Sequence, residues 1–343
     1  MKLHFKSRAV LLVFCYFFGC AHVAQAFALG GNDALGLDIP VNCNLGVDCF
    51  IQNYFDHTQG VESKDYTCGS LTYDNHSGTD FRLKNFHEIL KGVNVIASAN
   101  GLVVGVRDGE PDIAISVRGM KSVIGREAGN GVVIDHGYGW KTQYSHLKNG
   151  SVRVKVGQYV VQGEPIGLVG ESGNADFPHL DFGVRKDGNV VDPFAPNTPF
   201  ECGVSDLSSS LWTQTAKSQL GYQSTGVLLM GFSDKAPGLA QIDAFNGTSP
   251  PLSRDLTEFV FWAELFGVKR DDEILIGLSE LNGTTLNPTL NRTIANGNYA
   301  LLVVALSTVK PSSGWHGGIY RGTLELYRKG EKVLMKVTEG KFD

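Results

Sequence analysis

Pro178-His179-Leu180-Asp181-Phe182-Gly183-Val184 is a segment in which polar and apolar side chains alternate. Because residues two apart in a β-strand point to the same face, this alternation predicts a strand with one apolar face. His179 and Asp181 then share the opposite face. Burying two titratable groups without partners is costly, so we expect a metal ion or a hydrogen-bonded pair there. The alternative is a solvated His–Asp pair on the surface.

Short apolar runs of this kind fill the chain from Tyr73 to about Pro199. Glycine and other turn residues separate the runs, and none has a long helical period, although 85–90 could form one or two helical turns. The expected strands are 93–97, 102–106, 131–134, 142–145 and 152–156. The region therefore predicts an all-β domain.

A second group of apolar runs follows the serine-rich stretch 205–223, which has the composition of a linker. Further strands are expected at 259–265, 273–278, 299–304, 322–327 and 332–337. Their spacing favours an immunoglobulin-like β-sandwich. No catalytic group of residues is visible there, and we expect His316 to be a surface or packing residue.

The first residues predict an export signal. A positively charged start precedes an apolar stretch that is short for a bilayer span, and Ala24-Gln25-Ala26 fits a signal-peptidase site. We therefore expect the mature chain to begin at Phe27, in a periplasmic or extracellular compartment. Lipidation of Cys20 is the less favoured alternative. No later apolar stretch is long enough for a transmembrane anchor.

Four cysteines lie beyond this signal, at positions 43, 49, 68 and 202. An even number in an exported chain predicts two disulfides. A four-cysteine zinc site is disfavoured, because the spacings are irregular and contain no C-x-x-C. The pairing stays open, but any bond to Cys202 must tie the end of the first β region back to its start.

The composition is that of a globular protein with room for two domains: 343 residues, 42% of them hydrophobic. The net charge of −5 gives no reason to expect nucleic acid or an anionic membrane as a partner. The expected organisation is a signal peptide (1–26), a cysteine-containing wrapping segment (27–72), the first β domain (73–203), a linker (204–225) and the sandwich (226–343).

His76-Ser77-Gly78-Thr79-Asp80 is a second polar segment. Gly78 favours a turn over a helix, and a turn lets His76 and Asp80 converge on one point. Together with His179 and Asp181, they offer the imidazole and carboxylate ligands typical of catalytic zinc. A metal held by them would promote hydrolysis.

Three further residues, His136, His146 and Ser172, are candidates for a catalytic role. His146 and His136 each end an expected strand, where a histidine is more often structural than catalytic. Gly170-Glu171-Ser172-Gly173 is similar to a nucleophile elbow, but Asn174 breaks the G-x-S-x-G pattern, which disfavours a serine nucleophile.

Taken in order, the blocks HSGTDF, GNGVVIDHG, YSHL, VGQYVVQGEPIGLVGESG and PHLDFGVRKDG resemble the lysostaphin/LytM-type zinc endopeptidases of bacterial cell walls. The resemblance covers about residues 73–196 and implies a small antiparallel β domain with a groove. It implies that His76 and Asp80 are zinc ligands. It also implies that His146 and His179 are catalytic, flanking the attacking water as general base and stabilising the oxyanion. His136 matches no catalytic residue of the family.

Asp181 departs from the family, whose third zinc ligand is the second histidine of H-x-H. A carboxylate oxygen lies as many bonds from Cα as imidazole Nδ1, so Asp181 can itself be the ligand. Two carboxylates make Mn²⁺ or another divalent ion more competitive with Zn²⁺. The alternative is a degenerate site in a protein that only binds peptidoglycan or activates other hydrolases.

The resemblance favours an exported metal-dependent endopeptidase that cuts peptide stems or cross-bridges of peptidoglycan. We expect the sandwich to position it on the wall or on a wall-associated protein. The sequence leaves open whether the segment 37–72 blocks the groove.

Overall fold

The computed structural model describes residues 35–198, 200–244, 252–281 and 289–342. The expected signal peptide and Cys20 lie outside these residues. No helix in the described part is both long and apolar enough to cross a membrane. The prediction of an all-β class is confirmed, because strands dominate and the helices have at most six residues.

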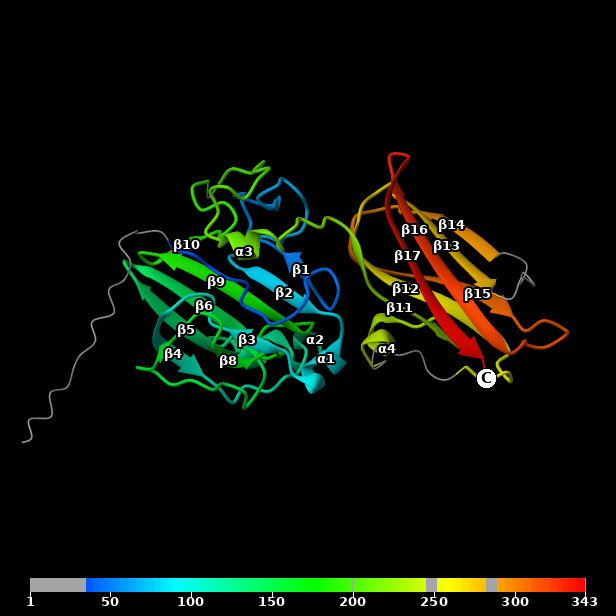
Figure 1. The fold of residues 1–343 in the computed structure, drawn as a ribbon, viewed down its shortest axis with the longest axis horizontal. Coiled ribbons are helices and arrows are strands. Elements are labelled where there is room, and N and C mark those ends of the chain that lie inside the picture. Colours follow the sequence, from blue (N-terminus) through cyan, green and yellow to red (C-terminus); the bar gives the residue numbers. More distant parts are fainter. Residues whose placement is uncertain (1–34, 199, 245–251, 282–288, 343) are drawn as a thin grey trace, which may run out of the picture. The chain divides into compact units, whose positions relative to one another are not determined.

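The first lobe is built on an eight-stranded sheet in which every neighbouring pair is antiparallel (Figure 1). The strand order is β1-β2-β9-β6-β5-β4-β7, with β10 beside β9, and β3 and β8 form a separate two-stranded sheet. The bounds are β1 Cys49–Asn53, β2 Thr79–Leu83, β3 Asn94–Ile96, β4 Gly101–Arg107, β5 Asn130–Gly137, β6 Trp140–Leu147, β7 Tyr159–Val160, β8 Pro165–Leu168, β9 His179–Lys186 and β10 Asn189–Val191.

One face of the large sheet packs on the core. Leu180 and Phe182 of β9 are fully buried in the same cluster as Val95 of β3 and Ile166 of β8. The small sheet therefore covers the core face, and the alternating residues of β9 point to the other face. The predicted alternation of β9 thus decides which of its residues can form a site.

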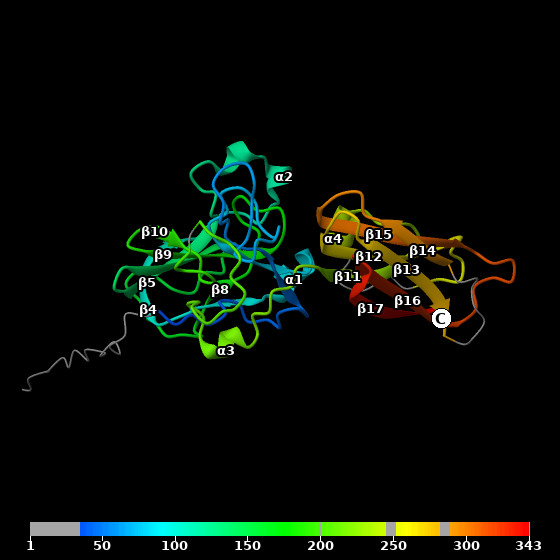
Figure 2. The same cartoon turned by 90° about the horizontal axis from the view of Figure 1, so that it is seen from above.

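Short helices lie on opposite sides of the large sheet (Figure 2). α3 Gln214–Lys217 packs on the core through buried Ala216, and Trp212 just before it is buried in the same core. α2 Ile115–Arg118 and η1 Met120–Val123 belong to the long connection from β4 to β5. The expected helical turn near 85–90 is α1 Phe86–Lys91, and the Asn85 side chain caps it by accepting from Glu88 N.

The expected strand at 152–156 is wrong. The segment pairs in no ladder, although Arg153 N donates to Ile166 O at 3.0 Å. Gly150 and Gly157, with φ of 72° and 85°, turn the chain at both ends, and the single backbone bond to β8 between these turns does not extend into a ladder.

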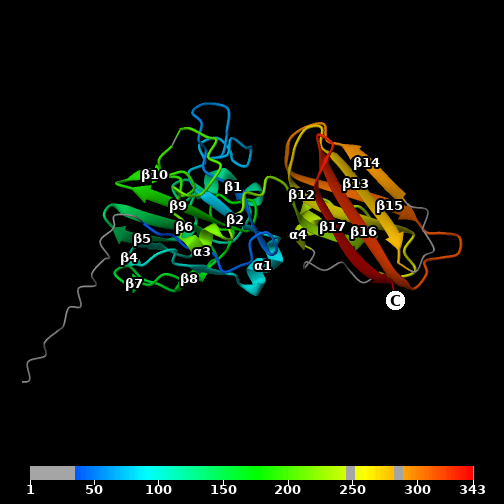
Figure 3. The same cartoon turned by 45° about the horizontal axis from the view of Figure 1, so that its top comes forward.

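The second lobe is a sandwich of a three-stranded sheet (β11-β12-β15) and a four-stranded sheet (β14-β13-β16-β17; Figure 3). The five expected strands are present, and β11 and β14 were not expected. A three-stranded and a four-stranded sheet agree with an immunoglobulin-like sandwich. The fourth strand of this lobe, β14, pairs with the third, β13. The bounds are β11 Gly226–Ser233, α4 Leu239–Ala244, β12 Glu258–Val268, β13 Glu273–Glu280, β14 Thr289–Ile294, β15 Tyr299–Val309, β16 Gly318–Arg328 and β17 Glu331–Phe342.

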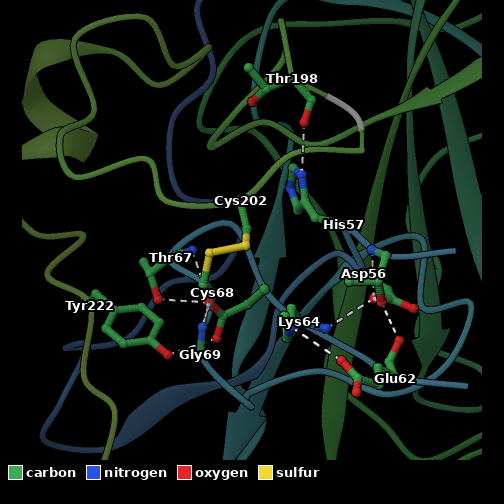
Figure 4. The surroundings of a disulfide bond; sticks show 12 residues. Asp56, His57, Glu62, Lys64, Thr67, Cys68, Gly69, Thr198, Cys202 and Tyr222 are labelled. Atoms are coloured by element: carbon green, nitrogen blue, oxygen red, sulfur yellow. Dashed lines mark hydrogen bonds and ion pairs between the residues drawn. A yellow bond between two sulfur atoms is a disulfide. The ribbon is translucent and has the colours of Figure 1, made fainter.

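Two disulfides are present, Cys43–Cys49 and Cys68–Cys202. The second joins residues 134 positions apart and ties the N-terminal segment to the chain after β10 (Figure 4). Nearby, His57 Nε2 lies 2.7 Å from Asp192 Oδ2, which adds a second link between the same two parts. The N-terminal segment is therefore part of the lobe and supplies its edge strand β1.

Candidate metal centre

His76, Asp80 and Asp181 form a group whose potential ligand atoms all lie within 4.8 Å of one another. His76 precedes β2, Asp80 lies in β2, and Asp181 lies in β9. The two strands pair antiparallel with Asp80 opposite Asp181, so both carboxylates rise from the same face. The structure thus brings together the three residues predicted as ligands.

The N-terminal segment orients two of these side chains. His76 Nδ1 donates to Tyr54 O at 2.7 Å, which leaves Nε2, 3.2 Å from Asp80 Oδ1, for a metal. Asn53 Nδ2 donates to Asp80 Oδ2 at 2.8 Å. The sequence offered no signal for Asn53 or Tyr54, because both lie more than twenty residues before their partners.

Gly78 makes room for Asp181. A Cβ atom at position 78 would lie 1.9 Å from Asp181 Oδ1, so only glycine fits in the turn between His76 and Asp80. Asp181 Oδ1 itself is buried and has no hydrogen-bond partner among the described residues. A buried, partnerless carboxylate oxygen beside an imidazole and a second carboxylate fits a divalent cation.

His146 and His179 lie beside this group, with their ring centroids 4.6 Å apart. His146 Nδ1 donates to Ser172 O at 2.7 Å, and His179 Nδ1 donates to Phe177 O at 2.8 Å. These bonds place the proton on Nδ1 and leave a lone pair on each Nε2. His179 Nε2 lies 3.7 Å from Asp80 Oδ1, at the edge of the group of ligands.

The pKa shifts differ between the two histidines beside the group, His146 and His179, and the candidate ligands. Burial lowers the pKa of His179 to about 4 and also lowers the pKa of His146, so both rings are neutral near pH 7. Burial, with the Asp80 charge next in importance, raises the pKa of Asp181 to about 6. Burial alone would lower the pKa of His76, but the Asp80 carboxylate raises it to about 9. The two carboxylates therefore attract positive charge.

Residues 74–193 match the family model described as Peptidase family M23. We call this part of the chain the M23 domain, after the family that it matches. The match spans β2 to β10 and includes every predicted site residue. At the level of the family, the match supports a metal-dependent peptidase.

The M23 domain is also similar to three curated bacterial proteins. It is 34% identical over 129 residues to peptidoglycan DD-endopeptidase ShyA of Vibrio cholerae (38% of this chain, 24% of that protein). The identity is 34% over 121 residues for cell division protein DipM of Caulobacter vibrioides (35% and 18%). It is 36% over 103 residues for murein hydrolase activator EnvC of Escherichia coli (30% and 22%). The matched part is less than a quarter of each relative.

Two solved structures align with similar regions. The catalytic domain of lysostaphin from Staphylococcus simulans is 24% identical, with a TM-score of 0.27, over 41% of this chain and 85% of that one. A catalytic-domain mutant of the prophage-encoded M23 protein EnpA from Enterococcus faecalis is 22% identical, with a TM-score of 0.31, over 43% and 91%.

His136 and Ser172 lie outside the metal centre of the M23 domain. His136 bonds through both nitrogens, with Asn100 O at 2.7 Å and Thr142 Oγ1 at 2.8 Å. Ser172 Oγ donates to Leu147 O at 2.7 Å and is fully buried. The glycine-rich turn around Ser172 instead orients His146, because the Ser172 carbonyl oxygen accepts from His146 Nδ1.

Proposed function

We propose that this chain is an exported, zinc-dependent endopeptidase that hydrolyses peptide bonds in peptidoglycan stems or cross-bridges. The observation that carries the proposal is the partnerless, buried Asp181 Oδ1 beside His76 and Asp80. The M23 match and the similarity to a protein named as a peptidoglycan DD-endopeptidase support the reaction and the substrate class.

His76, Asp80 and Asp181 would hold the metal, and Zn²⁺ suits one nitrogen and two oxygen ligands. When bound, the ion would supply Lewis acidity toward the scissile carbonyl and a more acidic water. The two carboxylates neutralise its charge, so Mn²⁺ or another hard divalent ion competes better here than at a site with two histidines.

His146 and His179 would handle protons. Each ring keeps Nε2 free for the substrate, because a backbone carbonyl accepts from Nδ1. A neutral Nε2 can take a proton from the attacking water, and the resulting imidazolium can stabilise negative charge on the tetrahedral oxygen. Their adjacent rings allow one histidine to act as base while the other binds the oxyanion.

A non-catalytic activator of wall hydrolases is the second candidate. It is favoured by the replacement of the family's ligand histidine by Asp181 and by the similarity to a protein named as a murein hydrolase activator. In that case Asp181 would serve no metal, and the sandwich would dock a partner hydrolase. In the endopeptidase proposal, the sandwich positions the enzyme on the periplasmic or extracellular wall.

Metal content and sacculus digestion test the proposal together. We expect the mature chain to hold about one zinc ion, measured by plasma mass spectrometry, and to clear a suspension of purified sacculi. Asp181→Ala should lose both properties. Asp234→Ala, at an exposed position of the sandwich, is the matched control and should keep both. If the wild-type chain holds no metal and digests no sacculi when zinc or manganese is supplied, the endopeptidase proposal is refuted.

A further inference from the structure

Residues of β4, β5 and β6 line a pocket of about 260 Å³. These three strands lie side by side in the sheet (Figure 3). Arg107, Gly131, Gln143 and Ser145 are among the residues that line it, and none of them belongs to the metal centre. Ala128 also lines it, and its carbonyl accepts from His146 N at 2.9 Å. The pocket therefore borders His146, one of the two proposed catalytic histidines.

The pocket and the metal centre lie in one row across the sheet. Asp181 of β9 pairs with Ser145 of β6, and Arg107 of β4 pairs with Gly131 of β5. A Cβ atom on Gly131 would lie 3.7 Å from Ser145 Cα, which joins the two pairs. Three strand spacings separate Arg107 from Asp181, roughly 14 Å, or about four residues of extended peptide.

Gly131 leaves the surface between Ser145 and Arg107 without a side chain. A Cβ atom there would lie 2.6 Å from Tyr144 O, so a side chain at this position would displace backbone. With no side chain between Ser145 and Arg107, an extended peptide can run from the metal centre to the pocket.

Arg107 gives the pocket its charge. It is the one ionisable residue among those lining it, and it makes no hydrogen bond or ion pair with any described residue. Backbone hydrogen bonds from Glu127 and Gly125 lower the pKa of the nearby Glu127 carboxylate, and the Arg107 charge adds to this effect, but that carboxylate accepts its hydrogen bond from Gly125 N and not from Arg107. Ser145 Oγ accepts from Gln143 Nε2 at 3.0 Å, and its own proton has no acceptor within the described part of the chain. A guanidinium and a hydroxyl are thus both available to an anion.

We propose that this pocket binds a carboxylate of the substrate peptide, held by the Arg107 guanidinium and the Ser145 hydroxyl. The inference rests on the proposed function and specifies its substrate as an acidic peptide. A charge-assisted pair of this kind discriminates strongly between a carboxylate and a neutral carboxamide, because only the carboxylate carries the matching charge.

Sacculi in which carbodiimide and ammonia have converted carboxylates to carboxamides provide the test. The variants are Arg107→Gln and, as a control that also removes one positive charge, Arg153→Gln, whose side chain bonds Asn94 on another part of the lobe. Two readouts are taken on untreated and amidated sacculi: the kinetics of digestion, and co-sedimentation of metal-free protein.

On untreated sacculi, Arg107→Gln should raise KM and weaken co-sedimentation about tenfold, with kcat within about twofold of wild type. On amidated sacculi, wild type and Arg107→Gln should behave alike. Equal binding by Arg107→Gln and Arg153→Gln on untreated sacculi would contradict the proposal that the pocket binds a carboxylate. Arg107-dependent binding without any digestion would support the pocket and refute the endopeptidase.

Discussion

Asn53 Nδ2 donates a hydrogen bond to Asp80 Oδ2 at 2.8 Å, so a residue of the N-terminal segment fixes a carboxylate of the metal centre. The two residues are also neighbours in the β1–β2 ladder. A segment that supports the ligands is a part of the site, which argues against its acting as a removable inhibitor of the groove.

Replacing Asn53 by alanine should weaken metal binding. Outer-shell partners of metal ligands typically contribute 10- to 100-fold in affinity, and we expect at least about tenfold here. The measurement is competition for zinc against a chromophoric chelator. Asn189→Ala, at an exposed position of β10, is the control. Equal zinc affinity in both variants would show that the Asn53 bond does not support the site.

Gly78→Ala should abolish metal binding while the fold persists. The added Cβ would occupy the position of Asp181 Oδ1, and forcing it in should cost about 1–3 kcal/mol of unfolding free energy. Gly221→Ala, where a Cβ meets nothing within 4 Å, should change neither quantity. Calorimetric zinc titration and urea denaturation measure the two effects. Wild-type zinc affinity in Gly78→Ala would contradict the assignment of Asp181.

The two disulfides should differ in their effect on stability. In the chain-entropy model, a disulfide that closes a loop of 134 residues stabilises the folded state by about 5 kcal/mol, and one that closes a loop of six residues does so by about 2 kcal/mol. Cys68→Ala/Cys202→Ala should therefore lower the urea midpoint more than Cys43→Ala/Cys49→Ala. It should also lower zinc affinity, because the freed segment carries Tyr54 and Asn53. The opposite order of midpoints would contradict this.

His136 should make the fold sensitive to mild acid. Burial lowers its pKa in the folded chain, whereas the unfolded chain titrates at about 6.5. Below that pH the unfolded state binds more protons, so the free energy of unfolding falls as the pH falls. His136→Gln has no titrating group at this position and so lacks this dependence of stability on pH. The gap in urea midpoint between wild type and variant should therefore narrow from pH 7.5 to pH 5.5, and a constant gap would count against it.

Much of the M23 domain could be predicted from its sequence, because alternation and turn residues act locally. The alternation of β9 placed His179 and Asp181 on one face, and the structure brings both beside His76, Asp80 and His146. Their roles as ligands and proton carriers stay predictions. The five strands expected in the sandwich are present, since each is a continuous apolar run.

The remaining features depend on contacts distant in sequence. Asn53 meets Asp80 only through pairing of β1 with β2, and nothing local in its loop-rich segment signals that contact. Arg107 becomes a candidate only when the register of four strands aligns it with Asp181. The expected strand at 152–156 has an apolar pattern, but flanking glycines remove it from any ladder.

Mass analysis of the muropeptides released from purified sacculi tests the central claim most directly. The zinc-loaded chain should release fragments with newly formed peptide termini, and a chelator or Asp181→Ala should prevent their release. Sacculi whose muropeptides are unchanged after incubation with the zinc- or manganese-loaded chain would contradict a metal-dependent endopeptidase.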